Sequence, residues 1–307
     1  MTHNETTIAH YIQYCAAQKQ LDPKTLKAYR IDLRQFQVFL KDCPIEQTTS
    51  FILENYIEML HKTYRPKTVK RKIASVKAMF HFFEYRGLIQ SNPFRKIQIH
   101  IRYPFELPKT IPIYIVETLL SSVYLQSKTA HTPYQRKNAL RDAAIMEFLF
   151  ATGVRVSELC TLSPRDIDLY EGIVLIHGKG NKERRIIIGA KSVIETLQGY
   201  QDHFHQEMDL CNHFFVNQSG NPVTDQAVRR IIKKYSSLAS IDFHITPHMF
   251  RHTFATSLLE ADVDIRYIQE MLGHSSINIT EIYTHVAMAK QKDILTSKHP
   301  RINMHIK

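Results

Sequence analysis

A histidine and an arginine open one predicted helix in a pattern suited to holding an anion. Thr246 and Pro247 are typical of a helix start, an N-cap residue followed by proline at the first helical position. His248 then lies in the first turn, and Arg251, three residues later, shares its face. An imidazole and a guanidinium group at the positive end of a helix favour a phosphate. Zinc is the alternative, with His248 and His252 as ligands, but the residue after His248 is not the general-base glutamate of a zinc helix.

Further polar side chains lie next to predicted helix ends. Arg155 follows a glycine that ends the preceding helix, and a surface salt bridge with Glu158 is its plain structural explanation. His274 comes directly after Gly273, which stands in the usual position past a helix C-terminus. Tyr283 follows in the segment Ile-Tyr-Thr-His. Taken singly, each of these residues fits a structural role as well as a functional one.

Lys179 lies in the turn of a predicted β-hairpin. Two β-branched runs, residues 173–177 and 184–188, are separated by Gly-Lys-Gly-Asn-Lys. Glycine on both sides of Lys179 lets the backbone approach a ligand closely. The spacing differs from that of a phosphate-binding Walker loop, and an ordinary polar turn is the alternative interpretation.

The elements that must position these residues are predominantly helical. A helix starts at Asp22-Pro23, and its apolar residues recur at steps of three and four up to Leu40. The same period predicts helices near residues 50–61, 67–85, 113–125, 140–150, 193–204, 225–238, 247–259 and 265–272, with a final stretch from Ser276. A polar stretch, residues 127–138, separates two of them. We therefore predict a mainly α fold with a small antiparallel β-sheet, made of a helical domain (1–100), a proline-containing linker (101–110) and a second domain (111–307).

Positive charge is concentrated in the first third of the chain. Residues 1–102 hold 17 basic and 8 acidic side chains, whereas the remaining residues hold 23 and 21. Such a basic module is expected of a surface that meets a polyanion, although a basic surface that only maintains solubility is the alternative. The candidate phosphate contacts lie on the outer faces of two predicted helices: Lys27, Arg30, Lys67, Lys70, Arg71 and Lys77.

Several classes of protein are excluded by composition. No apolar run approaches the ~18 residues of a membrane span, and the start of the chain lacks the pattern of a secretory signal. The four cysteines lie far apart, which argues against a zinc ribbon, a redox motif and a disulfide framework. We expect a protein of the reducing cytoplasm that has no membrane partner.

Taken in order, these segments resemble the tyrosine recombinase (phage integrase) family, and most closely its Xer-type site-specific members. The resemblance rests on A-T-G-V-R-V-S-E-L, G-K-G-N-K-E-R, P-H-M-F-R-H-T-F-A-T, L-G-H-S-S and I-Y-T-H-V. The segments T-L-K-A-Y and S-N-P resemble the family's core-binding, SAM-like domain, so nearly the whole chain is covered. Two departures concern partner or site preference rather than chemistry: the polar stretch 127–138 is longer than in compact members, and Phe250 replaces the usual leucine.

The resemblance implies a complete active site and a reaction. Tyr283 would attack a DNA phosphate and form a 3′-phosphotyrosyl ester, which a 5′-hydroxyl of a partner strand then resolves without metal, cofactor or ATP. Glu158 would support the cluster, and the segment 287–294 would be a C-terminal helix that docks on a neighbouring subunit. The expected assembly is a homo-tetramer, or a hetero-tetramer with a paralogue, on two DNA sites. The active-site residues are then Arg155, Lys179, His248, Arg251, His274 and Tyr283.

Two other functions share part of this pattern. A type IB topoisomerase would use the same chemistry without exchanging strands, but the Xer-like helical domain and the C-terminal tail argue against it. A DNA-binding architectural protein would have no reason to keep both arginines and the tyrosine. Because the chain starts almost directly with the core-binding domain, we expect dimer resolution or movement of a simple mobile element. The target sequence cannot be inferred from one chain.

Overall fold

The computed structural model describes residues 2–101, 109–178 and 182–273. Lys179, His274, Tyr283, the expected C-terminal helix and most of the predicted linker lie outside these residues. The chain divides into two compact units, Met1–Glu106 and Leu107–Lys307. The assignment of DNA-binding and catalytic roles to these units stays a prediction.

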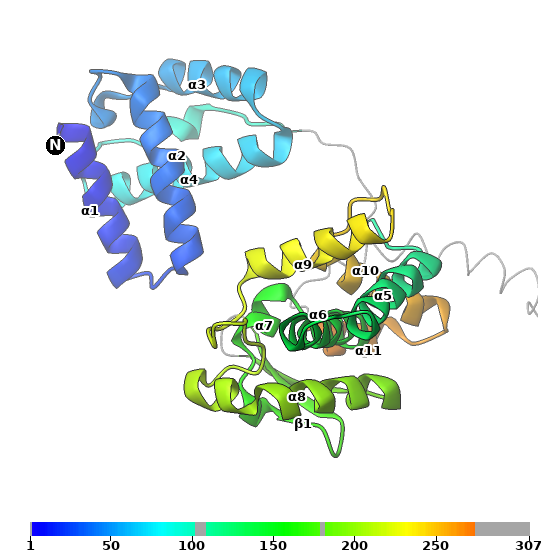
Figure 1. Ribbon diagram of the computed structural model, residues 1–307. Helices are drawn as coiled ribbons and strands as arrows, with labels where there is room; N and C mark the ends of the chain where they lie inside the picture. The colour runs from blue at the N-terminus through cyan, green and yellow to red at the C-terminus, as the bar shows by residue number, and fades with distance from the viewer. Residues whose placement is uncertain (1, 102–108, 179–181, 274–307) are drawn as a thin grey trace, which may run out of the picture. The chain divides into compact units, whose positions relative to one another are not determined.

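The N-terminal unit is a small helical domain (Figure 1). Its helices are α1 (His3–Ala17), α2 (Pro23–Leu40), α3 (Ser50–Thr63) and α4 (Pro66–Tyr85), with the short 3-10 turns η1 (Ile45–Gln47) and η2 (Pro93–Lys96). Asp22 caps α2 as its sequence indicates, since its carboxylate accepts a hydrogen bond of 2.8 Å from the amide of Lys24. Helix α1 was not predicted, although Thr2 and Glu5 form a capping box at its start. The core of the unit is aromatic and aliphatic, and includes Tyr11, Leu33, Phe36, Leu53, Tyr56, Val76 and Phe80.

The second unit combines helices with a small sheet. Its helices are α5 (Ile113–Lys128), α6 (Pro133–Thr152), α7 (Val156–Thr161), α8 (Lys191–Cys211), α9 (Asp225–Leu238), α10 (Pro247–Glu260) and α11 (Ile265–Leu272). Helix α6 packs against α5, α8, α9 and α10, so its residues from Ala143 to Leu149 are all buried. Such a central helix is apolar on most sides, which is why its sequence shows an apolar run that Glu147 alone interrupts between Ala143 and Leu149.

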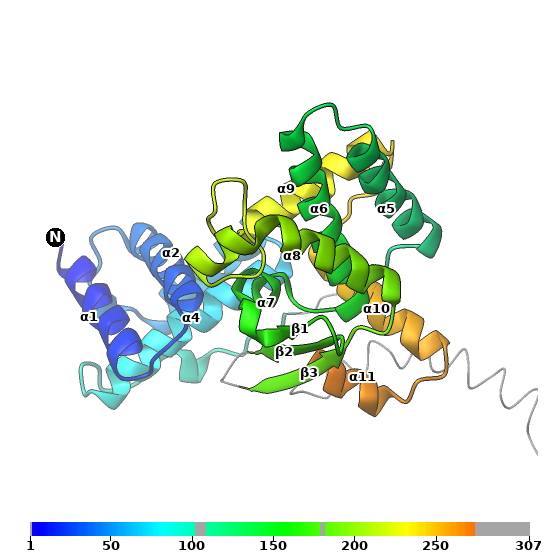
Figure 2. The same cartoon turned by 60° about the horizontal axis from the view of Figure 1, so that its bottom comes forward.

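The sheet is antiparallel, with the order β1-β2-β3 (Ile167–Asp168, Ile173–His177 and Glu183–Ile187). The predicted hairpin is formed by β2 and β3, in which Val174 pairs with Ile186 and His177 with Glu183. Strand β3 lies beside α11 (Figure 2). The prediction of a mainly helical fold with a small antiparallel sheet is therefore confirmed. No helix in the described ranges has both the length and the apolar character that crossing a bilayer requires.

The polar stretch 127–138 differs from its prediction. Helix α5 extends to Lys128 and α6 already begins at Pro133, so that the helix expected at 140–150 is longer at its N-terminal end. Thr132 caps α6 by accepting a hydrogen bond of 3.1 Å from the amide of Gln135, and proline occupies the first turn. The residues that follow are mostly polar, although several of them favour helix. A prediction based on the spacing of apolar residues therefore misses this part of the helix. Most of the stretch is therefore helical.

Candidate active site

The turn between α6 and α7 places Arg155. Gly153 ends α6 in the left-handed conformation, with φ of +60°, and a Cβ atom there would lie 2.5 Å from the ring of Phe254. Only glycine combines this backbone conformation with this close approach. Arg155 then stands at the N-cap of α7 and keeps 34% of its side-chain surface exposed. Its guanidinium group is thus held at a helix start and remains open to a ligand.

Arg251 is buried beneath the same turn. Its Nη1 atom donates to the carbonyl oxygen of Gly153 at 2.8 Å, and its Nη2 atom donates to that of Leu272 at 2.6 Å. These bonds tie α10 to the backbone two residues before Arg155 and to the C-terminal end of α11. Two arginines that are 96 positions apart in sequence are therefore fixed in one place.

His248 lies in the first turn of α10, as predicted, and is exposed. Partial desolvation lowers the pKa of its imidazole, and the positive charges of Arg229, Arg251 and Arg155 lower it further, against an opposing effect of Asp225. These charges act on His248 only because they lie near it. At neutral pH the ring is therefore uncharged and can accept a proton.

Glu158 is a buried carboxylate that fixes Arg155. It accepts hydrogen bonds from the amide of Arg155 at 2.9 Å and from the guanidinium Nη1 of Arg155 at 2.8 Å. Arg184 of β3 donates to both of its oxygens, at 3.1 and 2.7 Å. Burial alone would raise the pKa of Glu158, but the bonds from Arg184 and Arg155 outweigh burial and lower this pKa. The Arg155–Glu158 pair exists as the sequence suggested, but Glu158 is only 6% exposed, so it is not a surface salt bridge.

Arg184 is a residue of the site that sequence reasoning did not assign. Besides Glu158, its Nε atom donates to the carbonyl oxygen of Met271 at 2.7 Å. Its Cδ atom lies 3.1 Å from where a Cβ atom of Gly273 would be, so glycine at position 273 leaves room for this side chain. Arg184 therefore joins the Arg155 turn to the last residues before His274. Arg184 is the last residue of the segment G-K-G-N-K-E-R, one of the segments that resemble the family, and this position could have indicated its role.

The residues that border Lys179 are held by a second ionic group. Gly178 donates its amide to the carbonyl oxygen of Lys182 at 2.7 Å, which closes the end of the hairpin. The ring of His177 contacts Asp166 at 3.0 Å through Nε2 and Glu183 at 3.2 Å through Nδ1. The hydrogen bond with Asp166 is the main reason that the pKa of His177 is raised.

The predicted phosphate contacts of the N-terminal unit fall into two groups. All six side chains are exposed, namely Lys27 and Arg30 on α2 and Lys67, Lys70, Arg71 and Lys77 on α4. Arg71 also pairs with buried Asp32 of α2. At about 100° per residue, Arg30 and Asp32 lie about 160° apart around α2. The four residues of α4 share one face of that helix. Arg30 points away from Asp32, and therefore away from α4, and lines a groove between α2 and α1.

The comparisons with known proteins agree with this geometry. Residues 125–290 match the description "Phage integrase family", and residues 8–87 match "Phage integrase, N-terminal SAM-like domain". The chain belongs to the phage integrase family of tyrosine recombinases, enzymes that break and rejoin DNA by site-specific strand exchange. The family resemblance and the enzyme class predicted from the sequence are confirmed.

Relatives and solved structures resemble the chain over most of its length. A "Tyrosine recombinase" of Agathobacter rectalis is 61% identical over 99% of this chain and 100% of its own. A "Tyrosine recombinase XerC" of Bacillus subtilis is 32% identical over 95% of each chain. A lambda integrase tetramer bound to a Holliday junction shares the fold, with a TM-score of 0.69, 17% identity, and coverage of 89% of this chain and 77% of that one.

Proposed function

We propose that this recombinase has an Xer-type role, joining or resolving two DNA sites by sequential strand exchange. The proposal rests on one observation: Arg155 and Arg251 lie together beside a neutral His248. The bond from Arg251 to the carbonyl oxygen of Gly153 holds the two arginines in place. The similarity to a relative named XerC along almost the entire length supports the Xer-type role.

The two arginines suit the charge that develops during phosphoryl transfer. Arg155 and Arg251 would hold the nonbridging oxygens of the scissile phosphate and neutralise the negative charge of the transition state. Glu158 would support the reaction by orienting Arg155, to which it is bonded at 2.8 Å. Because guanidinium groups supply the positive charge, this step needs no divalent metal.

Proton transfer is assigned to residues on either side of the phosphate. The phenol of Tyr283, whose ordinary pKa is near ~10, loses its proton as its oxygen attacks phosphorus, and neutral His248 would accept it. The attack forms the 3′-phosphotyrosyl ester and breaks the bond to the 5′-oxygen. Lys179 would protonate this leaving oxygen, and His274 would donate a hydrogen bond to the phosphate. The roles of Lys179, His274 and Tyr283 rest on the family resemblance.

The assembly that we propose is a tetramer on two duplex DNA sites in the cytoplasm. The basic helical unit and the second unit would both bind the duplex. The segment after Tyr283 would contact a neighbouring subunit. The lambda integrase tetramer of the same fold supports this assembly. Either four copies of this chain or a pairing with a paralogue would satisfy it, in service of chromosome partition at cell division or of a mobile element.

The test begins by finding the DNA site. Genome-wide mapping of bound and cleaved DNA would give a sequence from which a nicked suicide substrate is made. The wild-type chain should accumulate a covalent protein–DNA adduct, and Tyr283→Phe should abolish the adduct while binding of the same DNA is retained. Relaxation of supercoiled DNA by the wild type without recombinant products would overturn the proposal and favour a topoisomerase.

A further inference from the structure

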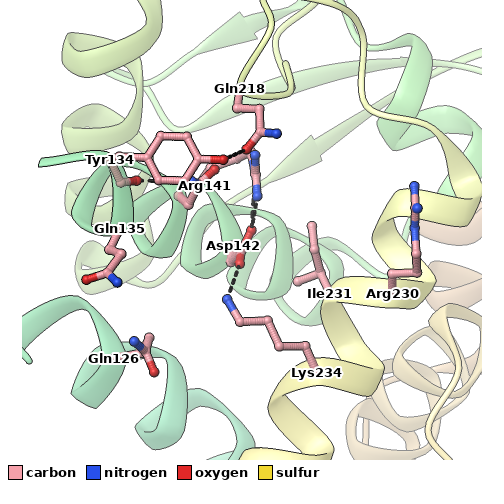
Figure 3. Close-up of a pocket in the computed structure, with 10 residues that line it drawn as sticks. Gln126, Tyr134, Gln135, Arg141, Asp142, Gln218, Arg230, Ile231 and Lys234 are labelled. Atoms are coloured by element: carbon pink, nitrogen blue, oxygen red, sulfur yellow. Dashed lines mark hydrogen bonds and ion pairs between the residues drawn. The ribbon is translucent and has the colours of Figure 1, made fainter. Parts of the chain in front are cut away.

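A polar pocket lies in the second unit, apart from the candidate active site, between α5, α6 and α9 (Figure 3). Its volume of about 460 Å³ lies within the usual range of ligand sites. Part of the polar stretch 127–138 forms one wall, where Tyr134 donates a hydrogen bond to Gln218 from the turn before α9. The stretch 127–138 therefore helps to form a pocket that the proposed reaction does not use.

The pocket carries an excess of positive charge. Arg141, Lys234 and Arg230 line it, together with one carboxylate, Asp142. Both carboxylate oxygens are engaged: Oδ1 accepts from Arg141 at 2.6 and 3.1 Å, and Oδ2 accepts from Lys234 at 3.3 Å and from the hydroxyl of Tyr235 at 3.1 Å. One negative charge thus faces three positive charges, which leaves a net attraction for an anion.

Asp142 also gives Arg141 and Lys234 a fixed position. Its side chain is only 2% exposed, and Arg141 is 12% exposed, whereas Lys234 keeps 48% of its surface open to solvent. Figure 3 shows Arg141 and Lys234 converging on the carboxylate from α6 and α9. Because the carboxylate is covered by its donors, an anion that enters the pocket meets cationic and amide groups first. The amide groups are those of Gln126, Gln135, Asn138 and Gln218.

We propose that this pocket binds a backbone phosphate of duplex DNA, at a position distinct from the phosphate that reacts. The inference rests on the proposed function, since it takes DNA as the substrate. It adds a sequence-independent contact, made by Lys234 and Arg230, that would hold the register of the duplex on the enzyme.

The shared helix α9 favours DNA over a free anion as the source of the phosphate. Asp225 and Arg229 on this helix influence His248, whereas Arg230 and Lys234 line the pocket. At 1.5 Å of rise per residue, Asp225 and Lys234 lie roughly 14 Å apart along α9. A duplex carries one phosphate on each strand per about 3.4 Å of its axis. About four phosphates of one strand span this distance, so a strand that follows α9 from the arginine pair would bring a backbone phosphate to the pocket.

The test measures how DNA affinity depends on salt, using the full chain and a duplex of arbitrary sequence. Each phosphate contact contributes about one unit to the slope of log K against log salt concentration. We expect Arg230→Gln and Lys234→Gln each to lower this slope by about one unit. The matched control is Lys191→Gln on α8, which removes an equal charge from a lysine that is 91% exposed, and it should leave the slope unchanged.

Two outcomes would overturn the proposal. The first is a slope in Arg230→Gln equal to that of the wild type, which would mean that the pocket makes no contact with DNA. Because Arg230 is exposed, its substitution should leave the fold intact. The second is an unchanged slope together with a thermal stabilisation of the wild type by inorganic phosphate. If both variants lose this stabilisation, the pocket binds a free anion instead. Because the slope is a binding measurement, it can fail while Tyr283 still forms a covalent adduct, so this failure is distinguishable from failure of the proposed function.

Discussion

Each unit of the chain buries a carboxylate between two cationic side chains, and the two clusters differ in where their cations lead. In the N-terminal unit, Asp32 is fully buried and accepts hydrogen bonds from Lys72 at 3.1 Å and from Ser75 at 2.9 Å, besides its pair with Arg71. Lys72 is itself buried and also lies 4.7 Å from the ring centre of Tyr64. This cluster joins α2 to α4: Lys72 ends inside the domain core, whereas Arg71 keeps 46% of its side-chain surface exposed.

In the second unit, Glu158 has a similar degree of burial but a different set of connections. One of its cations, Arg155, is partly exposed and belongs to the proposed active site, and the other, Arg184, reaches the end of α11. Both carboxylates are buried and each holds a partly exposed arginine, so burial of a carboxylate does not by itself mark a functional site. What distinguishes the two clusters is the second cation: Lys72 ends inside a domain core, whereas Arg184 connects the Arg155 turn to the C-terminal end of α11.

The largest effect is expected from breaking the cluster that we regard as structural. Asp32→Ala leaves the Lys72 ammonium buried without its carboxylate, and such a change costs about 3–5 kcal/mol of unfolding free energy. Urea unfolding followed by circular dichroism measures it, since the chain has no tryptophan. Asp42→Ala, at an exposed position, is the control. A loss below about 1 kcal/mol would contradict the buried-charge argument.

A smaller effect, on chemistry rather than folding, is expected from the second cluster. Arg184→Gln releases one side of Glu158 and so loosens Arg155, and a misplaced catalytic group costs about 100-fold in rate. The rate constant of covalent adduct formation at saturating DNA measures it in folded protein. Arg185→Gln, an exposed neighbour on β3, is the control. Equal rates for the wild type and Arg184→Gln would mean that Arg184 only stabilises the fold.

Acid should weaken the Glu158 cluster. The pKa of Glu158 is lowered in the folded protein, so its contribution to stability is fully present above the ordinary carboxyl pKa and is lost as pH falls through the lowered value. The difference in unfolding free energy between the wild type and Glu158→Gln should therefore shrink as the pH falls below 4.5, the ordinary pKa of this carboxyl group. Denaturant titrations at several pH values test this, and a difference that grows in acid would reverse the sign of the argument.

The smallest effect is expected from removing the charge of Arg229, which lies near His248 and belongs to neither cluster. The pKa of His248 is lowered by partial burial and by nearby cations, Arg229 among them. Arg229→Gln removes one of these charges, so the pKa of His248 should rise, and the rate of adduct formation should begin to fall at a higher pH than in the wild type. Single-turnover rates between pH 5 and 8 measure the shift. An identical acid limb in both proteins would exclude His248 as the base or Arg229 as its neighbour.

Local patterns predicted much of this fold, and long-range contacts account for what they missed. The helices from Asp22 and from Pro247 were predicted because their caps and apolar periods agree, and the hairpin because its two strands are adjacent in sequence. The short helix α7 escaped because six residues are too few to show a period. Arg184 bonds to Glu158, 26 positions before it, and to Met271, 87 positions after it, and no local pattern contains these contacts.

The bond between Arg251 and the carbonyl oxygen of Gly153 has a consequence for the timing of catalysis. This bond orders the guanidinium group of Arg251 within the folded chain, and Glu158 orders that of Arg155, so substrate does not have to assemble the pair. Control over when a strand is cut therefore cannot operate by separating this pair. In a subunit that has not yet cut DNA, this arginine pair would already be in place, and the signal to react would have to act elsewhere in the assembly.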